Sequence, residues 1–229
     1  MTLVEVEAQV RVKVWGAAAC FTRPELRVER VSYDVMTPSA ARGVLEAIYW
    51  KPEFHYEIRA IDVLRPIQRL WLRRNELKDR SRGPTNAEHN RAQRLTVALL
   101  DVAYVIHADL IAAPHEPHGA RKHQAALERR LRRGQCFTRP FLGCREFSAN
   151  FELPGVEDQP WPIDRALGTM LLDVRFEREE RGPNLFRTHD VHGARPARGS
   201  ARAVYFQAAL QQGRMLVPAA SYREVWDAR

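Results

Sequence analysis

The sequence predicts an α+β protein, in which a ferredoxin-like domain over residues 1–154 precedes a small antiparallel β-sheet domain over residues 155–229. Alternating apolar residues in several stretches indicate half-buried strands, and two stretches with helical spacing of apolar residues indicate helices between them. The segment 154–162 contains Pro and Gly and interrupts both patterns, as a domain boundary does. A chain of 229 residues with 45% apolar residues is long enough for this arrangement and can bury a core.

The first two elements have clear signatures. Residues 4–14 alternate strictly between Val or Ala and polar residues, which predicts a strand with one buried face. Thr37 and Pro38 are a typical N-cap and first-turn pair, so a helix is expected to run from there to about Trp50. Tyr49 falls at the edge of the apolar face of this helix, where a ring can pack while its hydroxyl stays accessible to solvent or ligand.

The remaining elements of the first part alternate in type. Strands are expected over residues 54–64 and 97–110, separated by a long basic loop at 72–94. A helix over 123–133 then leads into a strand that begins near Arg145. The order strand, helix, strand, strand, helix, strand is the split βαβ pattern of ferredoxin-like folds, which RNA recognition motifs share.

After the boundary, the sequence predicts antiparallel strands. Residues 168–177 and 201–210 alternate like strands and are separated by a basic connector at 178–200. Gln212-Gly213 is expected to form a tight turn into a short strand at 214–217. These elements form the predicted second domain.

Charge and cysteine content limit the classes of partner and compartment. The formal net charge is +8, and an excess of this kind favours a polyanionic partner such as nucleic acid. Cys20, Cys136 and Cys144 are odd in number and include no C-x-x-C pair, which indicates a reducing, cytoplasmic environment. The N-terminus lacks a signal-peptide pattern and no run of about 18 apolar residues occurs, so no membrane partner is expected.

The most informative stretch is residues 119–147, in which Lys122-His123 opens an Arg-rich helix. His123, Leu127 and Leu131 share one face of that helix. The helix macrodipole disfavours a lysine in the first turn, but the same position suits a bound phosphate, because backbone N–H groups and the ammonium converge on it. The alternative is a solvated lysine beside a half-buried capping histidine, and the spacing alone leaves both open.

Other chemistries have weaker support. Two groups of residues are candidate metal ligands, but neither has the spacing of a structural zinc site, and no metal or cofactor is expected. These groups are His115, His118 and His123, and His189, Asp190 and His192. No Gly-rich phosphate loop or G-x-S-x-G motif occurs, and no acidic pair ends a strand as a two-metal nuclease requires. Lys, His and Tyr side chains remain, and these groups can cleave a phosphodiester without a metal ion.

Three strings in the sequence resemble a known family. They are VWGAAACFTRPELRVERVSYDVMTPSAARGVLEAIYWKP, RAQRLTVALLDVAYVIHADL and RRGQCFTRPFLGCREF, and they cover most of residues 10–153. In these strings the chain is similar to the subtype I-C (Dvulg-type) branch of the fifth CRISPR-associated protein family, which belongs to the RAMP superfamily of RNA-handling proteins. The resemblance implies a ferredoxin-like N-terminal domain, a C-terminal β-sheet and a metal-independent endoribonuclease.

The resemblance also implies a substrate, partners and catalytic residues. Such proteins cut the repeat hairpin of precursor CRISPR RNA by attack of a ribose 2′-hydroxyl, which leaves a 2′,3′-cyclic phosphate and a 5′-hydroxyl. They stay bound to the crRNA 5′ handle as a subunit of the type I-C surveillance complex, and duplex DNA is a further candidate partner. By motif context the catalytic residues would be Tyr49 in AIYWKP and Lys122 and His123 in RKH.

Arginines would hold the RNA backbone, which predicts binding that weakens steeply with salt. The candidates are Arg23, Arg27, Arg30, Arg73, Arg74, Arg129, Arg130, Arg133 and Arg139. The alternative is that part of this basic surface is only the solvated face of a helix. Two other functions also stay open: a non-catalytic RNA-binding scaffold, which the Lys-His pair disfavours, and a metal-dependent DNA nuclease, for which the sequence offers no carboxylate cluster.

Overall fold

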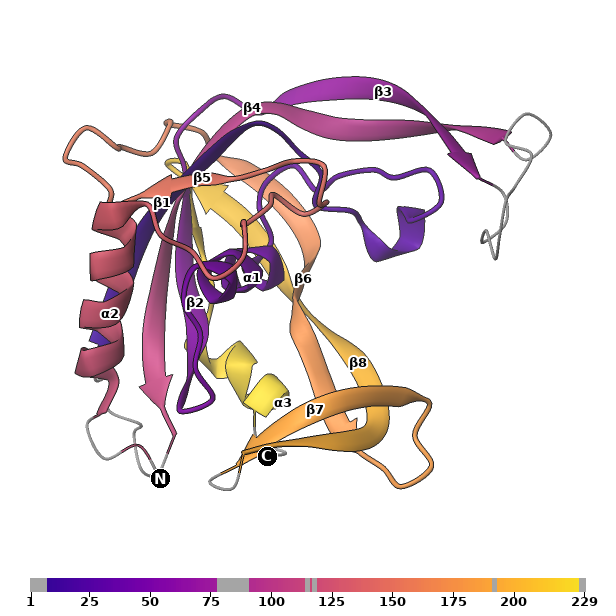
Figure 1. Ribbon diagram of the computed structural model, residues 1–229. Helices are drawn as coiled ribbons and strands as arrows, with labels where there is room; N and C mark the ends of the chain where they lie inside the picture. The colour runs from indigo at the N-terminus through magenta and orange to yellow at the C-terminus, as the bar shows by residue number, and fades with distance from the viewer. Residues whose placement is uncertain (1–7, 78–90, 114–115, 117–118, 191–192, 227–229) are drawn as a thin grey trace.

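A computed structural model describes residues 8–77, 91–113, 116, 119–190 and 193–226 (Figure 1). Its strands are β1 (Ala8–Ala19), β2 (Phe54–Val63), β3 (Gln68–Leu77), β4 (Arg91–Ala112), β5 (Asn150–Glu152), β6 (Arg165–Arg178), β7 (Asn184–Asp190), β8 (Gly193–Gln211) and β9 (Arg214–Leu216). Within the described residues they form one sheet in the order β5-β1-β4-β2-β9-β8-β6, with β3 paired to β4 and β7 to β8. These strand pairs are antiparallel, and the few helices complete the predicted α+β class.

Strands β1 and β2 confirm two of the strand predictions. Buried residues alternate with more exposed ones along residues 8–16, because one face of β1 packs on the core. Residues 4–7 of the predicted strand lie outside the described part of the chain. In β2 the alternation ends at a register shift between Ile58 and Ala60, after which the strand is buried on both faces.

The two main helices are α1 (Pro38–Ile48) and α2 (Gly119–Arg133), and both contact the sheet. The short elements are η1 (Pro24–Leu26), η2 (Ala219–Tyr222) and α3 (Arg223–Trp226). Thr37 caps α1 as predicted, since its side chain accepts a hydrogen bond from the Ala40 amide at 3.2 Å. Helix α2 begins four residues before the predicted start, and Gly134 ends it with a φ of +61°. In the part of the chain that the structure describes, no helix is long and apolar enough to cross a membrane.

The prediction of a loop over residues 72–94 is wrong at both ends. Residues 72–77 belong to β3 and residues 91–94 to β4, and the two strands pair as a ribbon that extends away from the helices (Figure 1). Both faces of this ribbon carry polar residues, so the sequence shows none of the apolar alternation that marks a half-buried strand. Residues 78–90 lie outside the described part of the chain.

Two other strand predictions need correction. Residues 97–110 were predicted to bury one continuous face, but the alternation is interrupted at Asp101, whose φ is +49°. Leu100, which was predicted on the buried face, is consequently 37% exposed. The strand expected to begin near Arg145 is limited to β5. A turn precedes it, and its Gly143 has a φ of +85° and leaves no room for a Cβ against the neighbouring backbone.

Strands β6, β8 and β9 confirm the three strands predicted after the boundary. Gln212 and Gly213 have φ values of 48° and 78°, which is the conformation that a two-residue hairpin turn requires. The prediction of a connector over residues 178–200 is wrong, because β7 and the first half of β8 pair in this segment. This hairpin was missed because its exposed, Arg-rich strands lack apolar alternation.

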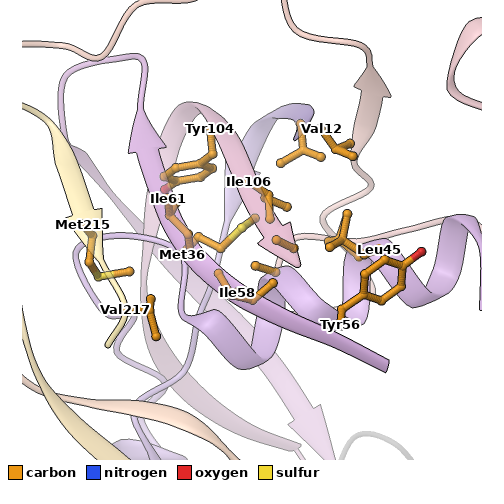
Figure 2. Packing of buried hydrophobic residues seen from close by; sticks show 14 of the residues in the cluster. Val12, Met36, Leu45, Tyr56, Ile58, Ile61, Tyr104, Ile106, Met215 and Val217 are labelled. Atoms are coloured by element: carbon orange, nitrogen blue, oxygen red, sulfur yellow. The ribbon is translucent and has the colours of Figure 1, made fainter. Parts of the chain in front are cut away.

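The hydrophobic core lies between α1 and the sheet and includes residues from both sides of the predicted boundary (Figure 2). Leu45 of α1 and Ile106 of β4 pack in the same cluster as Met215 and Val217, near the end of the chain. Strand β9 also pairs with β2. The division into two domains at residue 154 stays a prediction, but the two parts share one sheet and one core.

Candidate active site

Tyr49, at the end of α1, and His123, on α2, are in contact between these two helices. Tyr49 is the C-cap residue of α1, with an extended φ of −153° that turns the chain out of the helix. His123 lies on the buried face of α2 with Leu127 and Leu131, as predicted. The Tyr49 hydroxyl oxygen is 3.0 Å from Nδ1 of His123, so two residues far apart in sequence share a buried hydrogen bond.

Glu116, in the segment that precedes α2, contacts both residues of the Lys-His pair. Its Oε2 lies 3.3 Å from Nε2 of His123, and its two oxygens lie 2.9 and 3.0 Å from Nζ of Lys122. The side chains of Glu116 and His123 are each 1% exposed, whereas that of Lys122 is 46% exposed. We refer to Tyr49, Glu116, Lys122 and His123 as the His123 cluster. In it, a carboxylate of the protein sits between the ammonium and the imidazole.

Aromatic and cationic side chains cover Tyr49. The ring of Phe54, at the start of β2, stacks on Tyr49 with 5.7 Å between centroids and lies 4.6 Å from the His123 ring. The guanidinium of Arg130 lies 5.1 Å from the Tyr49 ring centre and donates a hydrogen bond to the Ile48 carbonyl at 2.7 Å. Burial raises the pKa of Tyr49, and the nearby Arg130 only partly opposes this, so the phenol is protonated at neutral pH.

The basic residues predicted on α2 divide into two kinds. Lys122, Arg129 and Arg133 are exposed on the outer surface of the helix. Arg130 is half-buried and turned toward Tyr49, as its two contacts show. The helix therefore presents exposed cations beside the His123 cluster, and one arginine belongs to the packing of the cluster itself.

Two predicted RNA-binding arginines form ion pairs with Glu76 of β3 and with Glu146. Arg30 lies 3.5 Å from Glu76 and 3.3 Å from Glu146. Arg74 lies 2.9 Å from Glu76 and also contacts Glu146. The two carboxylates offset much of this positive charge, so these arginines attract a phosphate less strongly than unpaired ones would.

The other predicted arginines lie on separate elements and are not brought into the His123 cluster. Arg23 stacks on the ring of Tyr33 at 4.4 Å, and Arg27 is exposed directly after η1. Arg73 is exposed on β3, and Arg139 donates a hydrogen bond to the Asn150 side chain at 3.1 Å.

The candidate metal ligands are only partly described. His115, His118 and His192 lie outside the described residues. Within the described residues, no group of three or more His, Cys, Asp or Glu side chains is arranged to hold a metal ion. His123 has Tyr49 and Glu116 as the partners of its two ring nitrogens.

Sequence reasoning missed Glu116 and Phe54 as members of the site. Phe54 was expected only as the first apolar residue of a strand, and nothing in its spacing indicates contact with a histidine of α2. Glu116 lies in a short segment without periodicity between β4 and α2. The sequence does show an acidic residue close to the Lys-His pair, but closeness in sequence alone does not indicate that the side chains are in contact.

Comparison with known proteins identifies the family. A family model described as CRISPR-associated protein (Cas_Cas5), Cas_Cas5d, matches residues 10–218. A Thermus thermophilus protein named CRISPR pre-crRNA endoribonuclease Cas5d is 44% identical over 220 residues, which cover 96% of this chain and 95% of that protein. A protein of the same name from Mannheimia succiniciproducens is 42% identical over 210 residues, which cover 81% of this chain and 92% of that protein.

Solved structures support the same fold. A functionally uncharacterized protein from Streptococcus mutans matches with a TM-score of 0.61 at 20% identity, over 93% of this chain and 94% of that chain. Identity at this level indicates a shared fold alone. The family match spans most of the chain and confirms the resemblance found in the sequence: the protein belongs to the Cas5d family of CRISPR-associated proteins.

Proposed function

We propose that this protein is a metal-independent endoribonuclease that cuts the repeat hairpin of precursor CRISPR RNA. The observation that carries the proposal is the His123 cluster, in which a hydrogen-bonded histidine lies beside an exposed ammonium at the start of a basic helix. The names of the two relatives, both CRISPR pre-crRNA endoribonucleases, support RNA cleavage as the activity.

The reaction is attack of a ribose 2′-hydroxyl oxygen on the adjacent phosphorus. The 2′-hydroxyl loses its proton, the bond to the 5′-oxygen of the next nucleotide breaks, and that oxygen gains a proton. The products are a 2′,3′-cyclic phosphate and a 5′-hydroxyl. This chemistry needs one group that exchanges protons and one that stabilises negative charge on the phosphorane.

The His123 cluster supplies both groups. The imidazole of His123 exchanges protons through its two ring nitrogens, one of which donates while the other accepts. The ammonium of Lys122 pairs with Glu116 but stays 46% exposed, so it also reaches a bound phosphate and stabilises the charge that develops on its oxygens. Tyr49 is protonated at neutral pH, so it orients the nucleophile and donates hydrogen bonds, and it is not itself the resting base.

Retention of the product follows from the distribution of charge. Arg129 and Arg133, exposed on α2, bind the hairpin backbone, and Arg73, exposed on β3, supplies a further contact from a separate element. We include Arg23, Arg27, Arg30, Arg74, Arg130 and Arg139 as secondary contacts, because packing or ion pairs engage most of them. The protein then stays bound to the crRNA 5′ handle as a subunit of a type I-C surveillance complex.

The finer description of the fold belongs to the same proposal. Strand order β5-β1-β4-β2, with α1 and α2 as the connecting helices, supports a ferredoxin-like arrangement of the first 154 residues, in which β3 is an additional ribbon strand. Residues 155–229 supply the second, β-sheet part.

The test is incubation of the protein with a matching repeat hairpin RNA in excess EDTA. The wild type is expected to make one cut with a cyclic phosphate end, and His123→Ala and Lys122→Ala to slow that cut by about 10²–10⁴-fold. Arg121→Ala, which removes an exposed cation adjacent to Lys122, is the matched control and keeps a rate close to the wild type. Lys122 is exposed, so its variant tests the site even where loss of the buried histidine impairs folding.

Each other result has a defined meaning. Normal cleavage by both site variants would contradict the assignment of the site. Tight binding without cleavage by the wild type would identify a non-catalytic scaffold. Loss of wild-type cleavage in EDTA, restored by a divalent cation, would identify a metal-dependent nuclease.

A further inference from the structure

We propose that Glu116 is a positioning residue for RNA cleavage, which holds His123 in the tautomer that accepts a proton from Tyr49. The inference rests on the proposed function, because it explains how the same site moves protons. Neither the sequence pattern nor the names of the relatives assign a role to Glu116.

The first step is the burial of the contacts. The side chains of Glu116 and His123 are each 1% exposed, so their 3.3 Å contact is shielded from water. A buried carboxylate is unfavourable unless it is paired. Lys122, with its Nζ 2.9 Å from Oε1, supplies the opposite charge that stabilises the ionised form of Glu116.

The second step is the position of the histidine proton. An ionised carboxylate only accepts hydrogen bonds, so Nε2 of His123 carries the proton and donates it to Glu116. In a neutral imidazole the other nitrogen, Nδ1, is then an acceptor. Its partner at 3.0 Å is the Tyr49 hydroxyl, which donates to it. Glu116, His123 and Tyr49 therefore form a directed chain of hydrogen bonds, with the carboxylate orienting a base toward a hydroxyl.

The third step is access. His123 is 1% exposed and both of its nitrogens are engaged, so an RNA oxygen does not reach them in this arrangement. Tyr49 is 8% exposed, more than His123, and contacts both His123 and Arg130. Tyr49 is thus the member of the chain through which His123 exchanges a proton with RNA.

The proton transfers balance in both directions. During attack, the 2′-hydroxyl proton moves to the Tyr49 oxygen as the Tyr49 proton moves to Nδ1 of His123. During departure of the leaving group, the Nδ1 proton returns to Tyr49 as the Tyr49 proton moves to the 5′-oxygen. Because the two transfers are coupled, no free phenolate is required, which agrees with the raised pKa of Tyr49.

Glu116→Gln is the informative variant. Glutamine keeps the size of the side chain, but its NH₂ group can donate to Nε2, which stabilises the opposite tautomer and leaves Nδ1 protonated toward Tyr49. Replacing the orienting carboxylate of a Ser-His-Asp triad by its amide acts in this way and costs about 10⁴ in kcat. We expect Glu116→Gln to slow single-turnover cleavage by at least about 100-fold, with affinity for the repeat RNA changed by less than about tenfold.

The control is Glu128→Gln, which removes a carboxylate from α2, the helix that carries His123. Glu128 lies 3.8 Å from Arg132 on the outer surface, away from the buried contacts of the cluster. This variant is expected to cleave at the wild-type rate. Tyr49→Phe, which removes only the hydroxyl, is expected to be as slow as Glu116→Gln.

A spectroscopic measurement tests the inference independently of RNA cleavage. The ¹⁵N chemical shifts of the two imidazole nitrogens report the tautomer, and the signals of His123 among the eight histidines are identified by their absence in His123→Ala. The wild type is expected to show the Nε2–H tautomer and Glu116→Gln the Nδ1–H tautomer. An Nδ1–H tautomer in the wild type would overturn the inference even if the variant did not fold.

The outcomes separate this inference from the proposed function. Wild-type cleavage by Glu116→Gln, with slow cleavage by His123→Ala and Lys122→Ala, would refute the role of Glu116 and leave the endoribonuclease site in place. Wild-type cleavage by all three variants would refute both.

Discussion

The carboxylate of Asp62 on β2 accepts hydrogen bonds from side chains of β4 and β9. We predict that its charge stabilises the fold by about 2 kcal/mol at neutral pH. Arg214 of β9 lies 2.5 and 2.9 Å from its two oxygens, and Nε2 of His107 on β4 lies 2.7 Å away. The Asp62 side chain is 2% exposed. Asp62→Asn removes the charge while it keeps the size of the side chain, so the pH dependence of its effect measures the electrostatic contribution of Asp62.

The magnitude follows from the pKa of Asp62. Burial raises this pKa, but hydrogen bonds from His107 and Arg214 outweigh burial and lower it from 3.8 to about 2. A folded-state pKa below the unfolded value contributes stability above pH 4, and this contribution is lost as pH falls toward 2. At about 1.4 kcal/mol per pKa unit, the contribution is about 2 kcal/mol at pH 7 and about 1 kcal/mol at pH 3.

The assay is urea unfolding of the wild type and Asp62→Asn at pH 7 and pH 3. The difference in unfolding free energy is expected to fall by about 1 kcal/mol between pH 7 and pH 3. Asp101→Asn is the control: Asp101 contacts Arg65 but is 59% exposed, so the change is expected to stay within about 0.5 kcal/mol. A loss for Asp62→Asn that is the same at both pH values would refute the argument, because it would show that the effect is steric and not electrostatic.

Two further predictions concern the RNA-binding surface and the cysteines. Binding of repeat RNA is measured at several salt concentrations with the His123→Ala protein as the background. Adding Arg133→Ala should lower the slope of log K against log salt by about 1, and adding Arg74→Ala should lower it by less, because Arg74 pairs with Glu76 and Glu146. Equal slopes for the two variants would contradict this ranking. At pH 7, iodoacetamide should modify Cys144 before Cys20, as followed by mass spectrometry. A hydrogen bond from the Cys20 thiol lowers the pKa of the Cys144 thiol, whereas the same contact raises the pKa of Cys20. Faster modification of Cys20 would show that the pair is polarised in the opposite sense.

Elements that bury one face could be predicted because burial leaves a periodic pattern in the sequence. The alternation in residues 8–14, the Thr37 cap and the spacing of His123, Leu127 and Leu131 all correspond to the observed strand and helices. Ribbon β3–β4 and strand β7 could not be predicted in this way. Their side chains are mostly polar or exposed, and the pairing of their backbones leaves no comparable signature.

The residues of the candidate site could likewise be predicted only in part from the sequence. The sequence determined the chemistry available, because Tyr49, Lys122 and His123 and the basic face of α2 follow from residue types, spacing and family resemblance. Only the tertiary structure decided that His123 is buried and that Glu116 and Tyr49 occupy its two nitrogens. The physical reason is that local periodicity depends on which face of an element is buried, whereas a contact between residues 49 and 123 depends on how α1 and α2 pack on the same sheet.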